Sequence, residues 1–267
     1  MKVMTTAGNT ASSLLRAIPL LFLLAGCSQS MDMGSDVLWT ARFEGNNFLE
    51  WTSVAGGGYS PPSNLGSMTV SNERAHQGTY SANLTVYAPA DTTQGNASFV
   101  RSGNLPMQAY YSAWYYLPRS VTVGVYWVIM KFRLRNVVDD PSTENELFDV
   151  NLKSLNDGGM SLRLYVHQGP VSGGDWPLQI VDPVVPVGDW FQIEAFYRVA
   201  ADSSGRLTLW LDGKQILDRV GPTGPTPWVA WDVVSVAEVL SPETATIFID
   251  DCAISNSRVG PTGSIGN

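Results

Sequence analysis

Three side chains that could neutralise a charge or move a proton stand at alternate positions in the segment 161–167. They are Arg163, Tyr165 and His167. Side chains two residues apart on an extended strand point to one face, about 7 Å from each other. An arginine can pair with a carboxylate, and a tyrosine or a histidine can take up or give a proton. This spacing therefore suits removal of a proton next to a carboxylate.

The two preceding segments, 126–136 and 147–154, show the same alternation of apolar and polar residues. Their even positions are apolar, so the period of two predicts strands with one buried face. The odd positions carry cations, an amide, a ring and one carboxylate, namely Trp127, Lys131, Arg133, Arg135, Asp149, Asn151 and Lys153. If the three strands are neighbours, their polar faces form one groove floor. An ordinary solvent-facing sheet gives the same alternation, so that alternative stays open.

The composition of this face favours an acidic polysaccharide as ligand. Five of the 16 Lys and Arg residues fall on it, in a chain of formal net charge −8. Guanidinium groups bind carboxylate or sulfate, and aromatic faces suit pyranose rings. The same net charge argues against nucleic acid as a partner. The predicted ligand-binding residues are Trp127, Lys131, Arg133, Arg135, Lys153, Arg163, Tyr165 and His167.

Composition and turns predict that an all-β domain positions these residues. The chain has 267 residues, with 10% aromatic residues, only 15% charged residues and 25 glycines, a balance that favours strands over solvated helices. Alternating segments are separated by turn residues, as at Asn156-Asp157-Gly158-Gly159. We predict a single antiparallel β-sandwich over residues 37–256. Two cysteines make neither a disulfide scaffold nor a zinc site.

Several motifs resemble those of the concanavalin A-like jelly-roll superfamily, in its laminin-G and polysaccharide-lyase variety. The similarity is strongest at Gly188-Asp189-Trp190-Phe191 and in the segment 205–213, which ends in Asp212-Gly213. The closing segment 247–251 is similar to the last strand of that fold. The resemblance implies a jelly roll whose concave face holds a glycan. Such fold-level motifs are specific for architecture and weak for activity.

Whether the chain is an enzyme stays open at this point. Our main prediction is binding of an acidic polysaccharide, and the alternative is a lyase that cleaves a uronate polymer by β-elimination. In the lyase, Arg163 would neutralise the substrate carboxylate, Tyr165 or His167 would be the base, and Asn151 would assist. The Gln-x-His signature of alginate lyases is absent, and Met130-Lys131-Phe132 would take its place. A second alternative is an adhesion or scaffold module that binds no sugar.

A glycoside hydrolase is disfavoured by the arrangement of carboxylates. On this fold, hydrolysis uses two carboxylates that face the groove from one strand. In phase with Asp149 the flanking positions are Leu147 and Asn151, and Glu146 has the opposite parity.

Three carboxylates lie near the ends of the first and last predicted strands. They are Glu44, Asp250 and Asp251. First and last strands often pair in jelly rolls, which would bring these acids together with carbonyl groups of the turn 45–47. Oxygen ligands of this kind suit calcium. We therefore predict a structural calcium site, with solvated edge charges as the alternative.

The N-terminal residues read as a targeting signal. The apolar run 17–27 is shorter than the about 20 residues that span a bilayer. It fits a signal peptide over residues 1–26, and Leu24-Ala25-Gly26-Cys27 resembles a lipobox. We expect Cys27 to carry lipid, residues 27–36 to be a tether and residues 257–267 a flexible tail. This implies anchoring in the outer membrane of a diderm bacterium, facing the periplasm or the cell surface.

Overall fold

The computed structural model describes residues 36–60, 65–91, 94–103, 105–135, 143–167, 174–176, 178–224 and 228–262. The predicted signal peptide, the predicted lipidation site Cys27 and the predicted tether up to residue 35 therefore lie outside the described residues. No helix in the described ranges has the length and apolar character needed to cross a bilayer.

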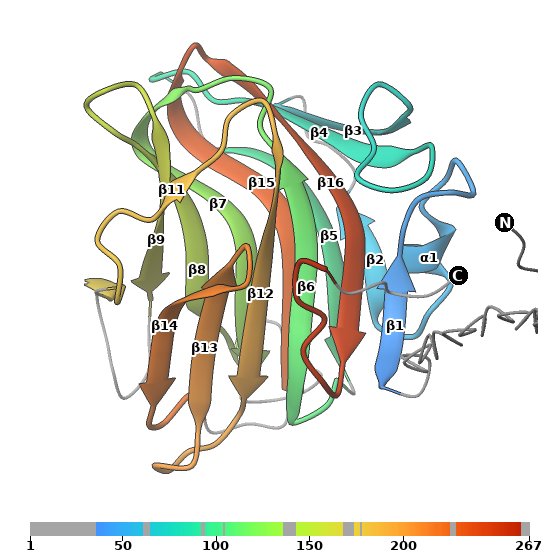
Figure 1. The fold of residues 1–267 in the computed structure, drawn as a ribbon, viewed down its shortest axis with the longest axis vertical. Helices are drawn as coiled ribbons and strands as arrows, with labels where there is room; N and C mark the ends of the chain where they lie inside the picture. Colours follow the sequence, from blue (N-terminus) through green and yellow to red (C-terminus); the bar gives the residue numbers. More distant parts are fainter. Residues whose placement is uncertain are drawn as a thin grey trace, which may run out of the picture. The chain divides into compact units, whose positions relative to one another are not determined.

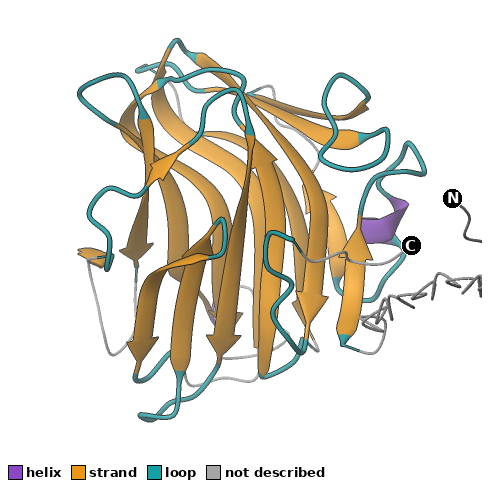
Figure 2. Cartoon of the chain, in the orientation of Figure 1, coloured by secondary structure: helices purple, strands orange, loops and turns teal. Residues whose placement is uncertain are grey.

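Two antiparallel sheets pack face to face and contain most of the described residues (Figures 1 and 2). Sheet A contains, in spatial order, β14 (Lys214–Val220), β13 (Arg206–Leu211), β12 (Trp190–Arg198), β6 (Gln108–Tyr116), β16 (Thr244–Ser255), β4 (Ser81–Tyr87) and β3 (Gly66–Ser71), while β1 (Val37–Ala41) pairs with β16. Sheet B contains β10 (Gly174–Trp176), β9 (Met160–Val166), β8 (Glu144–Ser154), β7 (Thr122–Arg135), β15 (Trp228–Ser241), β5 (Gly95–Gly103) and β2 (Gly57–Ser60), while β11 (Val184–Val185) pairs with β9. The predicted antiparallel β-sandwich is confirmed.

The core lies between the two sheets and is rich in aromatic rings. Trp51, in the short helix α1 (Leu49–Thr52), stacks on Phe99 with ring centroids 4.9 Å apart. Tyr111 and Trp231 meet across the sandwich at 5.4 Å. All four side chains are fully buried. Large rings from both sheets thus fill the space between the two layers.

The strands β7, β8 and β9 are consecutive neighbours in sheet B, as the alternation of their sequences predicts. The register places Lys131 of β7 opposite Asp149 of β8, and Asp149 opposite Tyr165 of β9. One row further on, Asn151 lies opposite Arg163. Residues paired across strands share a face, so the polar side chains of three strands come together on the outer face of sheet B.

A β-bulge interrupts the alternation in β7. Val128 pairs with Asn151 and Met130 pairs with Val150, so Ile129 is an extra residue relative to β8. Ile129 and Met130 both point into the core. Tyr126, Trp127 and Val128, which precede the bulge, consequently lie on the faces opposite to those that a strict period of two predicts.

Trp127 is the residue for which this matters most, and its predicted role is wrong. We expected Trp127 on the polar face as a ligand contact. Its side chain is instead fully buried in the core, where Nε1 donates a hydrogen bond to Ser235 Oγ at 2.9 Å. Tyr126 and Val128, which the alternation assigned to the core, take the outer face.

The C-terminal segment lies against the outer face of sheet A as far as residue 262. Glu194 of β12 has no exposed surface and accepts hydrogen bonds from the backbone N–H of Val259 at 2.7 Å and from Arg258 Nε at 3.0 Å. Gln192 Nε2 donates to the carbonyl of Gly260 at 3.1 Å. Residues 258–260, which belong to the predicted C-terminal tail, therefore supply the hydrogen-bond partners that the buried Glu194 and Gln192 side chains need.

The buried pair of Trp127 and Ser235 can be tested by a double-mutant cycle. Trp127→Phe leaves Ser235 Oγ buried without its donor, and Ser235→Ala leaves the indole N–H without its acceptor, each at a cost of about 1–3 kcal/mol. The double variant removes both groups, so its loss of unfolding free energy should be smaller than the sum by about 1 kcal/mol. Urea unfolding of the four proteins measures this. Strictly additive losses would contradict the contact.

Candidate functional site

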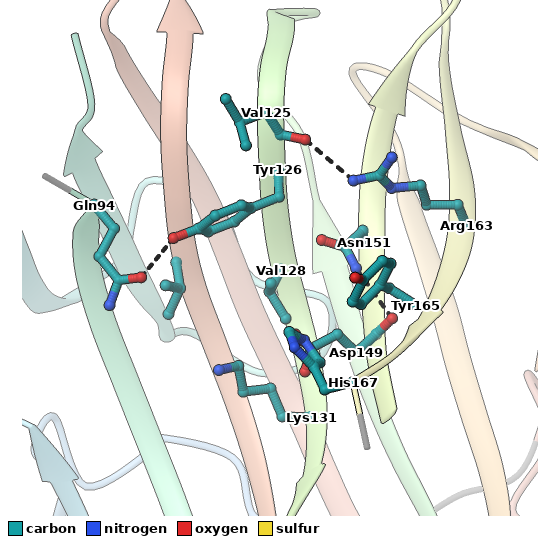
Figure 3. Close-up of a pocket in the computed structure, with 11 residues that line it drawn as sticks. Gln94, Val125, Tyr126, Val128, Lys131, Asp149, Asn151, Arg163, Tyr165 and His167 are labelled. Carbon is teal, nitrogen blue, oxygen red and sulfur yellow. Dashed lines mark hydrogen bonds and ion pairs between the residues drawn. The ribbon is translucent and has the colours of Figure 1, made fainter. Parts of the chain in front are cut away.

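A cavity of about 330 Å³ opens on the outer face of sheet B. It lies over β9, β8, β7 and β15 and reaches the residue that precedes β5 (Figure 3). Its lining residues are Gln94, Val125, Tyr126, Val128, Lys131, Asp149, Asn151, Arg163, Tyr165, His167 and Val236. Five residues that the sequence singled out, Lys131, Asn151, Arg163, Tyr165 and His167, are thus brought together here.

His167 and Asp149 form a short polar contact in the cavity. Nε2 of His167 lies 2.6 Å from Oδ2 of Asp149. The His167 side chain is 35% exposed, whereas that of Asp149 is only 5% exposed. The ring of Tyr165 meets the His167 ring edge to face, with centroids 4.7 Å apart. Two groups that can exchange protons therefore lie side by side over a buried carboxylate.

Arg163 and Asn151 form the opposite end of the cavity. Nη2 of Arg163 donates to the carbonyl of Val125 at 3.1 Å, so this side chain reaches from β9 across β8 to β7. Asn151 Nδ2 donates to the carbonyl of Asp149 at 3.0 Å. In Figure 3 the Arg163 guanidinium and the Lys131 ammonium lie at opposite ends, with Asn151 between them. The cavity therefore offers positive charge at both ends, which suits an anionic ligand.

Three other predicted ligand contacts lie outside the cavity, namely Arg133, Arg135 and Lys153. Arg133 Nε lies 2.6 Å from Oδ2 of Asp232 on β15. The Arg135 guanidinium stacks 4.1 Å above the ring of Trp228. Lys153 Nζ pairs with Asp182 Oδ1 at 3.0 Å. These cations extend the positive surface along sheet B beyond the cavity, but each also has a partner within the protein.

Tyr126 and Gln94 line the cavity and were missed from the sequence. Tyr126 Oη donates to Gln94 Oε1 at 2.5 Å, and the Tyr126 ring packs against the small outer cluster Val128, Val234 and Val236. The missed signal was the run of four apolar residues at 127–130. A run of this kind in an otherwise alternating strand is typical of a bulge, which re-aims side chains.

The predicted calcium ligands have hydrogen-bond and ion-pair partners within the protein. The strands β1 and β16 pair as expected. Glu44, however, accepts hydrogen bonds from the backbone N–H groups of Thr79 and Tyr80, both at 3.0 Å. In the part of the chain that the structure describes, no three His, Cys, Asp or Glu side chains are arranged to hold a metal ion. Glu44 therefore anchors the loop 73–80 instead.

Asp250 and Asp251 hold the same loop through different partners. Asp251 Oδ2 lies 2.6 Å from His76 Nδ1, and Asp251 Oδ1 lies 3.2 Å from Arg42 Nε. Asp250, which is fully buried, accepts a hydrogen bond from the backbone N–H of His76 at 2.9 Å. Cationic and N–H partners thus offset the repulsion between the two carboxylates that the sequence analysis assigned to a metal.

Comparison with known proteins shows which solved structures share this fold. No family model matches the sequence, and no curated protein sequence is similar to it. Among solved structures, the endo-β-1,4-glucuronan lyase of the fungus Trichoderma reesei has a TM-score of 0.61 at 14% identity, covering 78% of this chain and 95% of that one. Cellulose induced protein, Cip1, has a TM-score of 0.56 at 15% identity, covering 83% and 98%. The marine PL-14 alginate lyase from Aplysia kurodai has a TM-score of 0.55 at 11% identity, covering 83% and 99%.

These similarities span almost the full length of each neighbour, so they concern the whole sandwich rather than one motif. The chain has the concanavalin A-like jelly-roll fold, as the sequence resemblance implied. The structural neighbours include polysaccharide lyases named for glucuronan and alginate. At such low identity the comparison establishes the fold, and activity has to be argued from the cavity.

The Asp250–Asp251 pair gives a testable pH dependence of stability. Burial and the adjacent Asp251 carboxylate raise the pKa of Asp250 from 3.8 to about 8. Between these values the folded protein keeps a proton on Asp250 that the unfolded chain has lost, so stability falls as pH rises, by at most about 1.4 kcal/mol per pH unit. Asp250→Asn is neutral at every pH and should lose less stability across this window.

Urea unfolding of both proteins at about pH 5 and about pH 8 measures this difference. The wild-type protein should lose more unfolding free energy between the two pH values than Asp250→Asn does. Equal losses would show that Asp250 stays ionised in the folded protein.

Proposed function

We propose that this protein is a polysaccharide lyase that cleaves a uronate polymer by β-elimination. The observation that carries the proposal is the convergence of Lys131, Arg163, Tyr165 and His167 on one cavity in sheet B. Polysaccharide lyases among the structural neighbours support it, since they use the same fold on acidic polymers.

The two cations suit the first requirement of the reaction. A uronate carries a carboxylate on C5, and loss of the C5 proton places further negative charge on that carboxylate. Groups that neutralise this charge lower the barrier, and in a partly enclosed site they act more strongly than in water. Arg163 and Lys131 can supply this stabilisation, with the amide of Asn151 between them.

Tyr165 and His167 suit the second requirement, the transfer of two protons. One group takes the C5 proton, the electron pair of that bond forms the C4–C5 double bond, and the C4–O4 bond breaks. The other group gives its proton to O4 of the leaving chain. Tyrosine and histidine can fill both roles, and their rings are in contact at 4.7 Å.

Binding without cleavage is the second candidate function. The cations Arg133, Arg135 and Lys153 lie along sheet B outside the cavity, where they favour contact with a long anionic polymer. A lectin would need these cations and rings. It would have no need of a histidine held against a buried carboxylate beside a tyrosine, and for this reason we favour the lyase.

We also propose that the mature protein is anchored in the outer membrane by lipid on Cys27. The lipobox-like residues Leu24–Cys27 and the preceding apolar run support this proposal. A diacylglycerol together with an N-acyl chain exceeds the two hydrophobic signals that stable anchoring requires. A tethered lyase would act on polymer close to the cell.

Turnover is tested by the ultraviolet absorbance of the unsaturated uronate, which only β-elimination produces. Polyglucuronate and alginate should both be assayed. Arg163→Ala should lower kcat/KM by roughly 100-fold or more, because the developing charge loses a preorganised partner. Arg206→Ala is the matched control, since Arg206 pairs with Asp218 on sheet A, away from the cavity.

Binding to the same polymers separates the two candidate functions. His167→Ala should lose turnover while its affinity for the polymer changes little. A wild-type protein that binds uronate polymers and never yields the unsaturated product would contradict the lyase and favour the lectin.

Lipid anchoring is tested by Cys27→Ser in a diderm host. The variant should leave the membrane fraction and fail to incorporate labelled fatty acid. Cys252→Ala is the control, because Cys252 is the other cysteine of the chain and is buried in the sandwich. Membrane association of Cys27→Ser equal to that of the wild type would contradict the proposed anchor.

A further inference from the structure

We propose that Asp149 is a positioning residue that makes His167, rather than Tyr165, the base of the reaction. This inference rests on the proposed lyase function. It assigns a role to a buried carboxylate that lines the cavity and that no step described above uses.

The contact between Asp149 and His167 fixes the position of the imidazole proton. Oδ2 of Asp149 lies 2.6 Å from Nε2 of His167. An ionised carboxylate can only accept a hydrogen bond, so Nε2 must carry the proton in the neutral ring. The lone pair is then on Nδ1, which is the atom able to take a proton from the substrate.

The same contact fixes the orientation of the ring. His167 follows directly after β9, which ends at Val166, so the hydrogen-bonded ladder of the sheet stops before it. Asp149 lies in the middle of β8 and is paired with β7 and β9 on both sides. A side chain at a strand end is thereby held by a carboxylate on a rigid central strand, in the way that catalytic histidines are oriented by a third group.

The charges around His167 make such a partner necessary. Lys131 and Arg163 line the same cavity, and both disfavour a second positive charge on the imidazole. Tyr126 and Tyr165 also line the cavity, and neither is a carboxylate. Asp149 is the one carboxylate among the described lining residues, and it is in contact with the ring that becomes an imidazolium.

The assignment gives a balanced sequence of proton transfers. Nδ1 of His167 takes the C5 proton, the electron pair forms the C4–C5 double bond, and the C4–O4 bond breaks. O4 takes the proton of Tyr165 Oη. The imidazolium then returns a proton to the Tyr165 phenolate, directly or through water, between rings whose centroids are 4.7 Å apart. Both side chains end in their starting states.

The chain contains a matched pair that serves as control. His76 and Asp251 also form a 2.6 Å contact, and the Asp251 side chain is 3% exposed. This pair belongs to the sheet A side of the sandwich, where Asp251 is part of β16. Asp149→Asn and Asp251→Asn therefore remove the same charge from the same kind of pair, once inside the cavity and once away from it.

The experiment compares the pH profiles of both variants with that of the wild type on polyglucuronate and alginate. Asp149→Asn should lower kcat by roughly 100-fold, while KM changes by less than about threefold, because orientation and proton transfer are lost but binding is kept. The acidic limb of the kcat/KM profile should move to lower pH, since a neutral amide no longer favours the imidazolium. Asp251→Asn should keep the wild-type kcat and profile.

Nitrogen NMR of the wild-type imidazoles supplies a second readout that needs neither turnover nor a variant. The proposal requires the proton of neutral His167 to reside on Nε2. A proton on Nδ1, or an Asp149→Asn variant with wild-type kcat and pH profile, would overturn it.

Failure of the lyase function and failure of the role of Asp149 give different experimental results. Absence of product from every uronate polymer would remove the lyase function, and the assignment of His167 as base would fall with it. Wild-type turnover combined with an unchanged Asp149→Asn profile would remove only the role of Asp149.

Discussion

A single extra residue in β7 determines which side chains form the walls of the cavity. Because Ile129 is a bulge, Lys131 faces outward on one side of it, while Tyr126 and Val128 face outward on the other. A regular strand would present only one of these two sets. The bulge thus places the apolar Val128 and the cationic Lys131 on one cavity wall, and it does so at the cost of one unpaired position in the middle of sheet B.

Asp149 is the one carboxylate among the described residues that line the cavity. Two cations and a histidine in one partly enclosed space repel each other whenever the histidine is charged, and burial strengthens that repulsion. Asp149 offsets it from a position with almost no exposure to solvent. The arrangement resembles other buried charge networks, in which the removal of one member costs more than the pair itself contributes.

The part of the cavity that regular strands build was predictable from the sequence. Asn151, Arg163, Tyr165 and His167 lie where the period of two places them, because β8 and β9 pair without irregularity. The side of the sheet on which Trp127 lies was not predictable from the same rule. A one-residue insertion moves side chains to the opposite face, and the alternation within one strand does not show how that strand pairs with its neighbour.

Interaction partners that are distant in the sequence explain the other differences between the prediction and the structure. Asp250 and Asp251 were predicted as metal ligands, and the structure pairs them with His76 and Arg42. Arg258 and Val259 belong to the predicted tail, and the structure pairs them with Glu194. The sequence shows which residues are charged. The groups that pair with those charges come from strands or loops tens to hundreds of positions away. The motifs that indicate the fold predicted the structure more reliably than single residues did, because many residues contribute to them.

The chain has only two histidines, and each is bound to an aspartate on a different side of the sandwich. The protein therefore contains one intrinsic reporter for each sheet. A ligand that changes the imidazole signals of His167 and leaves those of His76 untouched reveals the face it occupies, without any label. The reverse pattern would locate it over the loop that His76 secures.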